Sequence, residues 1–499
     1  MKMWRVLTLA VPLLVLCAHE ARGQQTPASS PTSIPYPAYG TPAPGVSEGA
    51  PVIGVPQRVT LAQAIAIGAA RSPVLASARA DQALAQSAVS LARTGALPAL
   101  SLNAGTTRFG GGSSGISGSG ATGTGGFSGG GSAGGNGSFI SNTANFGLRQ
   151  LIFDGGRVAT QIRAASLSEV ASAQTYQRQL QTVSFTVANA YYNALAAESA
   201  TVVAVAVVRQ NQTGENLVRA QVRAGTTARA DIATAELPTV QARVAVVRAQ
   251  GTELSAVAAL ANAMGIDANA NVRPVDDTSV IRTASLSQIP LLTYDQAVTR
   301  ALSLRPDFVS AQRSLEAAEA SLRAARLGRA PTISGNASLG VNSTDSNGSQ
   351  FRSSNQIGAT FSLPVFDQGL SAAQTEQARA QIDRAVATLQ TTRLGIQLNV
   401  KQALVNLISA RAASDQVRAE LAKARQVLGS TQAQYRAGVT TLPLLLNAQV
   451  GLTQAENDQL TAVYGLRQAE QNFLFALGEN DLQLTSPSSV SIRRGSTGH

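Results

Sequence analysis

The sequence predicts a mainly α-helical protein with a smaller β component, built as two tandem structural repeats. Long stretches contain neither glycine nor proline, which is typical of continuous helix. Two other windows alternate apolar and polar residues with a period of two, as half-buried strands require. The same landmarks occur twice in the same order, so each half is expected to run helix, β-hairpin, long helix, helix.

The composition argues against enzymatic chemistry. Charged residues make up 13% of the chain, about half of the ~25% of ordinary globular proteins. Cys17 and His19 lie near the amino terminus, and the only other histidine is His499. We therefore expect no enzyme activity and no catalytic, cofactor-binding or metal site. The net charge is +11, but the basic residues form no cluster, so no nucleic-acid partner is expected.

Residues 1–23 are predicted to be a secretory signal peptide. Lys2 and Arg5 provide the positive region, and the apolar stretch 6–16 precedes a cleavage site with small residues. Lipidation of Cys17 is not expected, because the leucine before it is larger than the small residue that precedes an acylated cysteine. The protein is therefore expected to be exported.

Two terminal segments are predicted to lie outside the folded body. Residues 24–58 hold eight of the 19 prolines and are expected to form a disordered arm, because this composition neither propagates a helix nor packs a core. The role of this arm stays open. Residues 483–499 are expected to be a flexible tail.

The repeats are predicted at 59–270 and 291–482, with a linker at 271–290. Their matching landmarks, 213 residues apart, are Phe153–Asp154–Gly155–Gly156 with Phe366–Asp367–Gln368–Gly369, Arg223–Ala224–Gly225 with Arg436–Ala437–Gly438, and Gly265 with Gly478. Landmarks before the hairpins recur at a spacing of 233, so the first hairpin is longer by 20 residues. The Gly/Ser-rich run 110–137 accounts for this difference as a long loop.

The β-hairpins are predicted at about 99–153 and 332–366. In the first, Leu100, Leu102 and Ala104 alternate with polar residues. Eight of the twelve phenylalanines lie in these two windows, which is consistent with aromatic girdles at a bilayer interface.

Long helices are predicted to fill the rest of each repeat. From Arg157 to Thr213 there is no glycine or proline, and from Leu370 to Leu428 only Gly395 interrupts. The valine-rich run 202–208 favours a strand by propensity, but it lies inside this unbroken pattern and is expected to be helical.

After residue 23 no run of about 18 apolar residues is found, so any crossing of a bilayer is expected to use the strands. Four strands cannot close a barrel, and an open edge in lipid leaves backbone groups unsatisfied. Two copies would give eight strands around a filled interior, whereas three give twelve around a solute pathway, which favours a homotrimer. The alternative is a small soluble sheet that caps a coiled-coil protein.

The chain resembles the TolC family of outer-membrane channel proteins between Val59 and Leu482. The similarity rests on Leu151–Ile152–Phe153–Asp154–Gly155–Gly156 and Pro364–Val365–Phe366–Asp367–Gln368–Gly369, on the Arg-Ala-Gly turns at 223–225 and 436–438, and on Ala476–Leu477–Gly478. This resemblance implies a TolC-like trimer with a 12-stranded β-barrel in outer-membrane lipid and a periplasmic α-helical tunnel. It also implies an adaptor (membrane fusion) protein and an inner-membrane pump as partners.

The function implied is the outer-membrane channel of a tripartite efflux system that exports small molecules such as drugs. One alternative is the outlet of a type I protein secretion system. The other is a non-transporting, trimeric coiled-coil protein of the cell surface.

Three groups of site residues follow from the resemblance and from elementary chemistry. The strand-to-helix junctions are Phe153, Asp154, Gly156, Phe366, Asp367 and Gly369, where the aspartates would cap helix amino termini and the glycines would allow the turn. The periplasmic tips are Arg223, Ala224, Gly225, Arg436, Ala437 and Gly438, where each glycine would end a helix; the resemblance makes them candidates for adaptor contact.

The resemblance places a periplasmic gate at Tyr435, Leu444, Asn447 and, as the first-repeat counterpart of Leu444, Asp231. Some family members carry two aspartates where this chain has Leu444 and Asn447. A ring of carboxylates would bind cations, whereas leucine and asparagine would form an apolar or neutral collar.

Overall fold

The computed structural model describes residues 58–109, 139–270, 272–275, 292–345 and 350–479. The predicted signal peptide 1–23, the arm up to residue 57, the Gly-rich loop 110–137 and the tail 483–499 lie outside the described residues.

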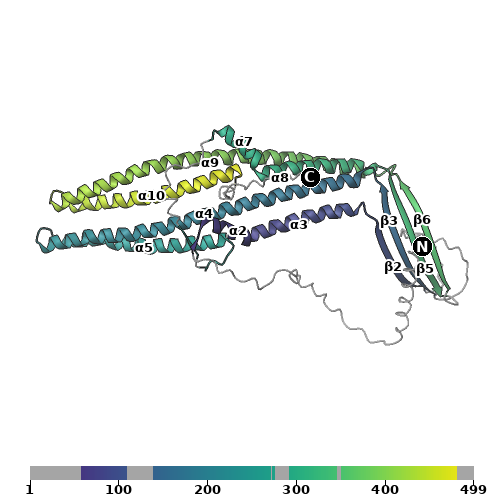
Figure 1. Ribbon diagram of the computed structural model, residues 1–499, viewed down its shortest axis with the longest axis horizontal. Coiled ribbons are helices and arrows are strands. Elements are labelled where there is room, and N and C mark those ends of the chain that lie inside the picture. Colours follow the sequence, from purple (N-terminus) through teal and green to yellow (C-terminus); the bar gives the residue numbers. More distant parts are fainter. Residues whose placement is uncertain (1–57, 110–138, 271, 276–291, 346–349, 480–499) are drawn as a thin grey trace, which may run out of the picture. The chain divides into compact units, whose positions relative to one another are not determined.

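The described residues form two halves with the same order of elements (Figure 1). The first half comprises α2 (Leu61–Arg71), α3 (Pro73–Thr94), β2 (Ala99–Phe109), β3 (Phe139–Phe153), α4 (Arg157–Arg223) and α5 (Ala230–Ala263). The second comprises α7 (Tyr294–Leu304), α8 (Pro306–Arg326), the 3₁₀ turn η2 (Leu327–Arg329), β5 (Thr332–Asp345), β6 (Gln350–Ser362), α9 (Leu370–Arg436) and α10 (Leu442–Leu477).

The two halves begin with the same capping chemistry. Thr60 and Gln63 form a capping box at the start of α2, and Thr293 and Gln296 form one at the start of α7. In such a box two backbone N–H groups that the helix leaves free are satisfied by side chains. Each first helix then ends where a proline opens the next helix, because proline tolerates the first helical turn but not the interior.

Helices α4 and α9 each contain 67 residues, which at 1.5 Å per residue is about 100 Å. The valine-rich run 202–208 is helical, as expected. Helix α4 also continues through Gly214, beyond the predicted stretch. A Cβ atom at Gly214 would lie 3.1 Å from the Gln449 amide nitrogen of α10, so the glycine permits a close approach of two helices.

The four long strands form one antiparallel sheet in the order β2-β3-β5-β6, so the two hairpins are joined by the pairing of β3 with β5. Strand β6 ends at Ser362, whereas the sequence pattern extends the hairpin to 366. The reason is Pro364, which has no N–H to donate to a strand ladder.

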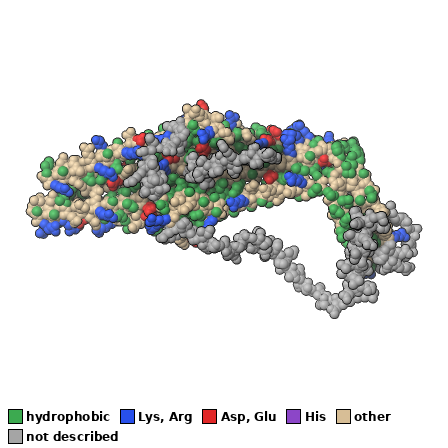
Figure 2. Space-filling view, in the orientation of Figure 1, with side chains coloured by type: hydrophobic (Ala, Val, Ile, Leu, Met, Phe, Trp, Pro, Cys, Tyr) green, Lys and Arg blue, Asp and Glu red, His purple; other side chains and the backbone are tan. Residues whose placement is uncertain are grey.

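The two faces of this sheet differ in chemistry. Across the four strands, Leu100 pairs with Leu148, Leu148 with Ala337, and Ala337 with Ile357, so these apolar side chains share one face. Leu100 is 63% exposed and Ile357 is 89% exposed. The residues that alternate with these along each strand, such as Ser101 and its cross-strand partners, form a polar face. Figure 2 shows hydrophobic side chains gathered on this part of the molecule.

The helices pack in antiparallel pairs, α4 with α5 and α9 with α10 (Figure 1). One buried cluster joins α7, α9 and α10 around Val400, Leu407 and Phe473. A second joins the far ends of α4, α5, α9 and α10 around Val218 and Tyr435.

A short parallel sheet was not anticipated from the sequence. Strand β1 (Arg58–Val59) pairs with β4 (Arg273–Pro274), which lies in the predicted linker. The Tyr191 hydroxyl of α4 hydrogen-bonds the carbonyl oxygens of Val59 and Val275 at 3.2 and 2.7 Å. This hydroxyl therefore ties both strands to the long helix.

Two described helices, α4 and α5, are long and apolar enough to cross a membrane on length and composition alone; α2 and α3 would add a third span if they are counted as one bent pair. The sequence-based expectation of no helical span is therefore too strict. It required an unbroken apolar run, whereas these windows mix valine and alanine with a few charged residues. Only 22% of the α4 window and 11% of the α5 window is buried in one chain.

Candidate functional site

The two helix tips have the same geometry. At the end of α4 the Thr226 N–H donates to the Gln221 carbonyl at 3.0 Å, and the Gly225 N–H donates to Val222 at 3.1 Å. At the end of α9 the Val439 N–H donates to Gln434 at 2.9 Å and Gly438 to Tyr435 at 3.1 Å. This is the Schellman arrangement, in which the glycine takes a left-handed conformation; φ is 72° at Gly225 and 74° at Gly438.

The predicted tip residues are all exposed: Arg223, Ala224, Gly225, Arg436, Ala437 and Gly438. Nothing in the described residues lies within 4 Å of a Cβ built on either glycine. The tips therefore offer free backbone and two arginine side chains to a partner.

The structure brings two of the four predicted gate residues together. Tyr435 is only 7% exposed and packs in a cluster with Leu442 and Leu445. Burial raises the pKa of the Tyr435 hydroxyl, and the nearby negative charge of Asp231 raises it further. Asp231 lies in the first turn of α5, where a carboxylate complements the helix dipole.

The other two predicted gate residues, Leu444 and Asn447, lie on α10, on a helix face that does not pack into the Tyr435 cluster. Leu444 is 51% exposed and Asn447 is exposed, three residues further along, whereas the intervening Leu445 is 2% exposed and packs on α9 and α4. Positions three residues apart share one helix face. Leu444 and Asn447 therefore form a free apolar and neutral strip beside the buried Tyr435 cluster.

The strand-to-helix junctions are held by aspartates. Asp154 accepts hydrogen bonds from the Gly156 N–H at 2.9 Å and the Val158 N–H at 2.6 Å. Asp367 accepts from Gly369 at 3.3 Å and Ser371 at 3.0 Å. These bonds satisfy N–H groups that the first helical turn leaves free.

Backbone conformation at the junctions explains the glycines. Gly156 and Gly369, the residues just before α4 and α9, have φ of 87° and 86°. A side chain is strained there, so each turn needs a glycine. The phenylalanines before the aspartates are solvent-facing in one chain: Phe153 is 48% exposed and Phe366 is 84% exposed.

The two junctions differ in one ion pair. The Arg329 guanidinium donates to Asp367 at 2.9 and 3.4 Å. Hydrogen bonds from Arg329 and Ser371 lower the pKa of this carboxyl group far below its usual range. The position that matches Arg329 in the first repeat is Ala96, so Asp154 has no such partner.

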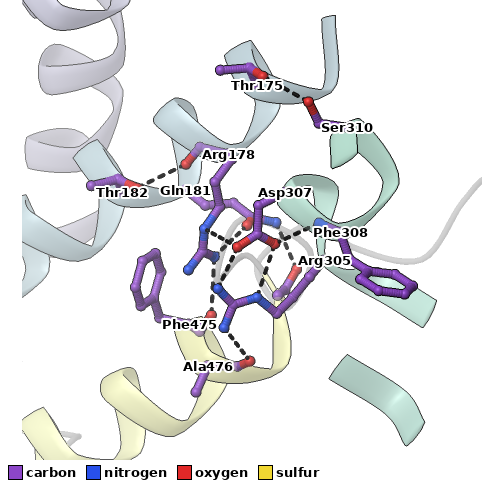
Figure 3. Close-up of polar contacts among 11 residues, drawn as sticks. Thr175, Arg178, Gln181, Thr182, Arg305, Asp307, Phe308, Ser310, Phe475 and Ala476 are labelled. Atoms are coloured by element: carbon purple, nitrogen blue, oxygen red, sulfur yellow. Dashed lines mark hydrogen bonds and ion pairs between the residues drawn. The ribbon is translucent and has the colours of Figure 1, made fainter. Parts of the chain in front are cut away.

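A buried ionic cluster, which sequence reasoning missed, joins the two halves (Figure 3). The Asp307 carboxylate of α8 accepts hydrogen bonds from Arg305 at 3.1 and 2.6 Å and lies 3.8 Å from the Arg178 Nε of α4. Arg178 also lies over the Phe475 ring of α10, 3.9 Å from its centre. Arg305 donates to the Ala476 carbonyl at 3.3 Å.

The charges in this cluster are mutually stabilised. Burial raises the pKa of Asp307, but the hydrogen bonds and charge of Arg305 and the charge of Arg178 outweigh it, so the pKa is lowered. Burial and the charge of Arg305 lower the pKa of Arg178 to about 10, so it stays protonated at neutral pH. The cluster fastens the end of α10 to α4 and α8.

One sequence signal could have indicated the cluster. Arg305 precedes Pro306 at the position where the first repeat has Ser72 before Pro73. An arginine at a position where the first repeat has serine indicates that an opposite charge lies nearby in the fold. Its counter-charge Asp307 is two residues away, but Arg178, the second arginine at that carboxylate, is more than 120 residues away in the chain, so spacing alone cannot find the full cluster.

Among the described residues, no group of three or more His, Cys, Asp and Glu could hold a metal ion. A groove of about 850 Å³ between α4, α9 and α10 is lined mainly by amide and small side chains, together with the carboxylates Glu420 and Asp458. Such a groove can bind or guide a chain or a solute.

Comparison with known proteins agrees with this geometry. A family model described as outer membrane efflux protein matches residues 66–266 and 297–479. The chain belongs to the outer membrane efflux protein family. The protein is accordingly an outer-membrane channel subunit for efflux, with its helical part in the periplasm.

Individual relatives cover most of the chain. Outer membrane protein TolC of Escherichia coli K12 is 25% identical over 441 residues, which cover 82% of this chain and 81% of TolC. Protein CyaE of Bordetella pertussis is 29% identical over 336 residues, 66% of this chain and 69% of CyaE. The solved outer membrane protein VceC of Vibrio cholerae has a TM-score of 0.68 at 19% identity and covers 84% of this chain and 96% of its own. The predicted TolC-like fold and family resemblance are confirmed.

Proposed function

We propose that three copies of this efflux protein pool their sheets into a 12-stranded barrel, and that small molecules leave the cell through it. The observation that carries this proposal is the four-stranded sheet, which has one apolar face, one polar face and no partner at the outer edges of β2 and β6 among the described residues. Unpaired edges in lipid cost several kcal/mol per backbone group, so copies must pair β6 with β2.

The strand lengths suit this role. The four strands contain 11, 15, 14 and 13 residues, and a tilted strand needs about 9–11 to cross a bilayer. The apolar face would contact lipid, and the polar face would line the pore.

A stripe on α5 supports assembly through the helices as well. Its members recur at helical spacing and are 47–72% exposed in one chain: Leu237, Val240, Val244, Val247 and Leu254. Apolar residues at i, i+3, i+7 and i+10 form the seam that coiled coils bury against a partner helix. We assign this stripe to the contact between neighbouring subunits in a helical tunnel.

The tips and the gate complete the proposal. TolC-like efflux proteins work with an adaptor and a pump, and the exposed Arg-Ala-Gly turns at 223–225 and 436–438 are the proposed adaptor contacts.

Leu444 and Asn447 are proposed to line the periplasmic constriction as a neutral collar, with Tyr435 and Asp231 holding the helices behind it. The pump would supply the energy.

Reconstitution into planar lipid bilayers tests the channel. We expect discrete conductance steps from the purified protein and a mass of three subunits in detergent. A water-soluble coiled coil without conductance would overturn the proposal. Cross-linking in cells, followed by identification of the inner-membrane transporter, separates efflux from type I protein secretion.

The collar has its own test. Leu444→Asp would place three carboxylates at the constriction and is expected to introduce block of the single-channel current by divalent cations. The matched control is Val450→Asp, which changes an exposed residue six positions further along α10. Unchanged block in the Leu444 variant would remove this residue from the constriction.

A further inference from the structure

We propose that Arg149 and Arg352 make the sheet section of the pore selective for anions, an inference that rests on the proposed function. Both arginines lie on the polar face of the four-stranded sheet. Arg149 of β3 pairs with Asn336 of β5, and Arg352 of β6 pairs with Asn342 of β5.

The register settles which face they share. Asn336 and Asn342 are separated by an even number of residues, so they point to the same side of β5. Their side is opposite to that of Ala337, Leu339 and Val341, which belong to the apolar face. The proposed pore wall therefore carries both guanidinium groups.

No carboxylate shares this face with the two arginines on the described strands, since Asp345 at the end of β5 pairs with Ile140 on the other face. Arg149 and Arg352 are exposed, and no ion pair or side-chain hydrogen bond is made by either within the described residues. The other described side chains on this face are neutral: serine, threonine, asparagine, glutamine, glycine, one alanine and one leucine. In a trimer each arginine becomes a ring of three positive charges.

The two rings act as separate barriers to cations. Asn342 lies six positions after Asn336 along β5, a rise of about 20 Å at ~3.4 Å per residue. The Debye length is about 10 Å at 0.1 M salt and about 3 Å at 1 M. The rings are therefore largely independent, and the preference they impose must weaken as salt is raised. The neutral Leu444 and Asn447 collar adds no opposing charge.

The test is the reversal potential of the reconstituted trimer in a KCl gradient near 0.1 M. We expect chloride to be more permeant than potassium, and the ratio of chloride to potassium permeability to fall roughly twofold or more in Arg149→Gln and in Arg352→Gln. Arg149→Lys keeps the charge and should retain the preference, which a purely structural role of the guanidinium would not explain.

Arg108 provides a matched control. It lies on β2 opposite Ile140, on the other face of the same sheet, and is also exposed. Arg108→Gln should leave the permeability ratio unchanged.

The outcomes are distinct. A conducting trimer whose ratio is the same in wild type and in the double variant Arg149→Gln/Arg352→Gln would overturn the inference and leave the channel intact. An equal shift of the permeability ratio in Arg108→Gln would overturn the assignment of Arg108 and the other two arginines to opposite faces of the sheet. Absence of any conductance in the wild type would overturn the proposed function itself.

Discussion

Asp307 carries the negative charge of the ionic cluster that joins the two halves. Its carboxylate lies between the guanidinium groups of Arg178 in α4 and of Arg305, the residue before α8, and its side chain is only 28% exposed. Removing one partner from such a partly buried set leaves like charges facing each other without compensation. The contact therefore depends on the balance of charges in the cluster.

Asp307→Asn is expected to destabilise the protein by about 1–3 kcal/mol at neutral pH, because Arg178 and Arg305 lose their counter-charge. The pKa of Asp307 is lowered on folding, so its contribution is complete above the unfolded value near 3.9 and is lost as pH falls through the lower folded value. Thermal unfolding in detergent should show a lower Tm for Asp307→Asn than for the wild type, and this difference should narrow below about pH 4. A difference that stays constant into acid would contradict this assignment.

Gly438 has a different role, because it sets backbone conformation at a tip. Its φ of 74° is unfavourable for any residue with a Cβ, so Gly438→Ala should cost about 1–2 kcal/mol and weaken proposed adaptor binding. Gly395→Ala is the matched control, since Gly395 lies inside α9 with open space around it and alanine there should stabilise by about 0.5–1 kcal/mol. Melting curves and adaptor pull-down would measure both. Equal changes in Tm and adaptor binding in the two variants would contradict the role of the positive φ at Gly438.

At the scale of an element, the sheet depends on strict alternation. A shift of one residue would exchange the apolar and polar faces. Phe361 of β6 pairs with Ile333, is 64% exposed and belongs to the apolar face.

Phe361→Asp should reduce the amount of assembled protein in the outer membrane, because a charge on the lipid face is costly. Thr360→Asp, one residue earlier on the polar face, is the control and should assemble normally. Membrane fractionation with a trimer-specific gel would compare them. Similar losses in both variants would argue that the face does not contact lipid.

At the scale of the whole molecule, one chain leaves too much apolar surface uncovered. The sheet face and the α5 stripe are both exposed in a single subunit, although neither can remain so in water. Assembly with copies of the same chain and insertion into lipid cover these surfaces together.

Val247→Asp, at the centre of the α5 stripe, is expected to lower the fraction of trimer in detergent, because a carboxylate would be buried between subunits. Thr252→Asp lies beside the stripe and should assemble as the wild type does. Light scattering of the purified proteins would give the masses. A fully trimeric Val247 variant would place the stripe outside the subunit contact.

The sequence alone determined the features that depend on local periodicity and repetition. Strands alternate with period two, helices lack breakers, and Gly156, Gly369, Gly225 and Gly438 mark the positions where φ must be positive. These patterns were enough for the four strands, the long helices and the family.

Only the tertiary structure decided which distant residues meet. The Arg178, Asp307 and Arg305 cluster joins parts of the chain more than 120 residues apart, and the pairing of β1 with β4 closes a loop of more than 200 residues. No local pattern records such a contact, because its partners are chosen by the packing of α4 against α8 and α10. The same holds for Arg149 and Arg352, because the face that they share depends on the register of three strands.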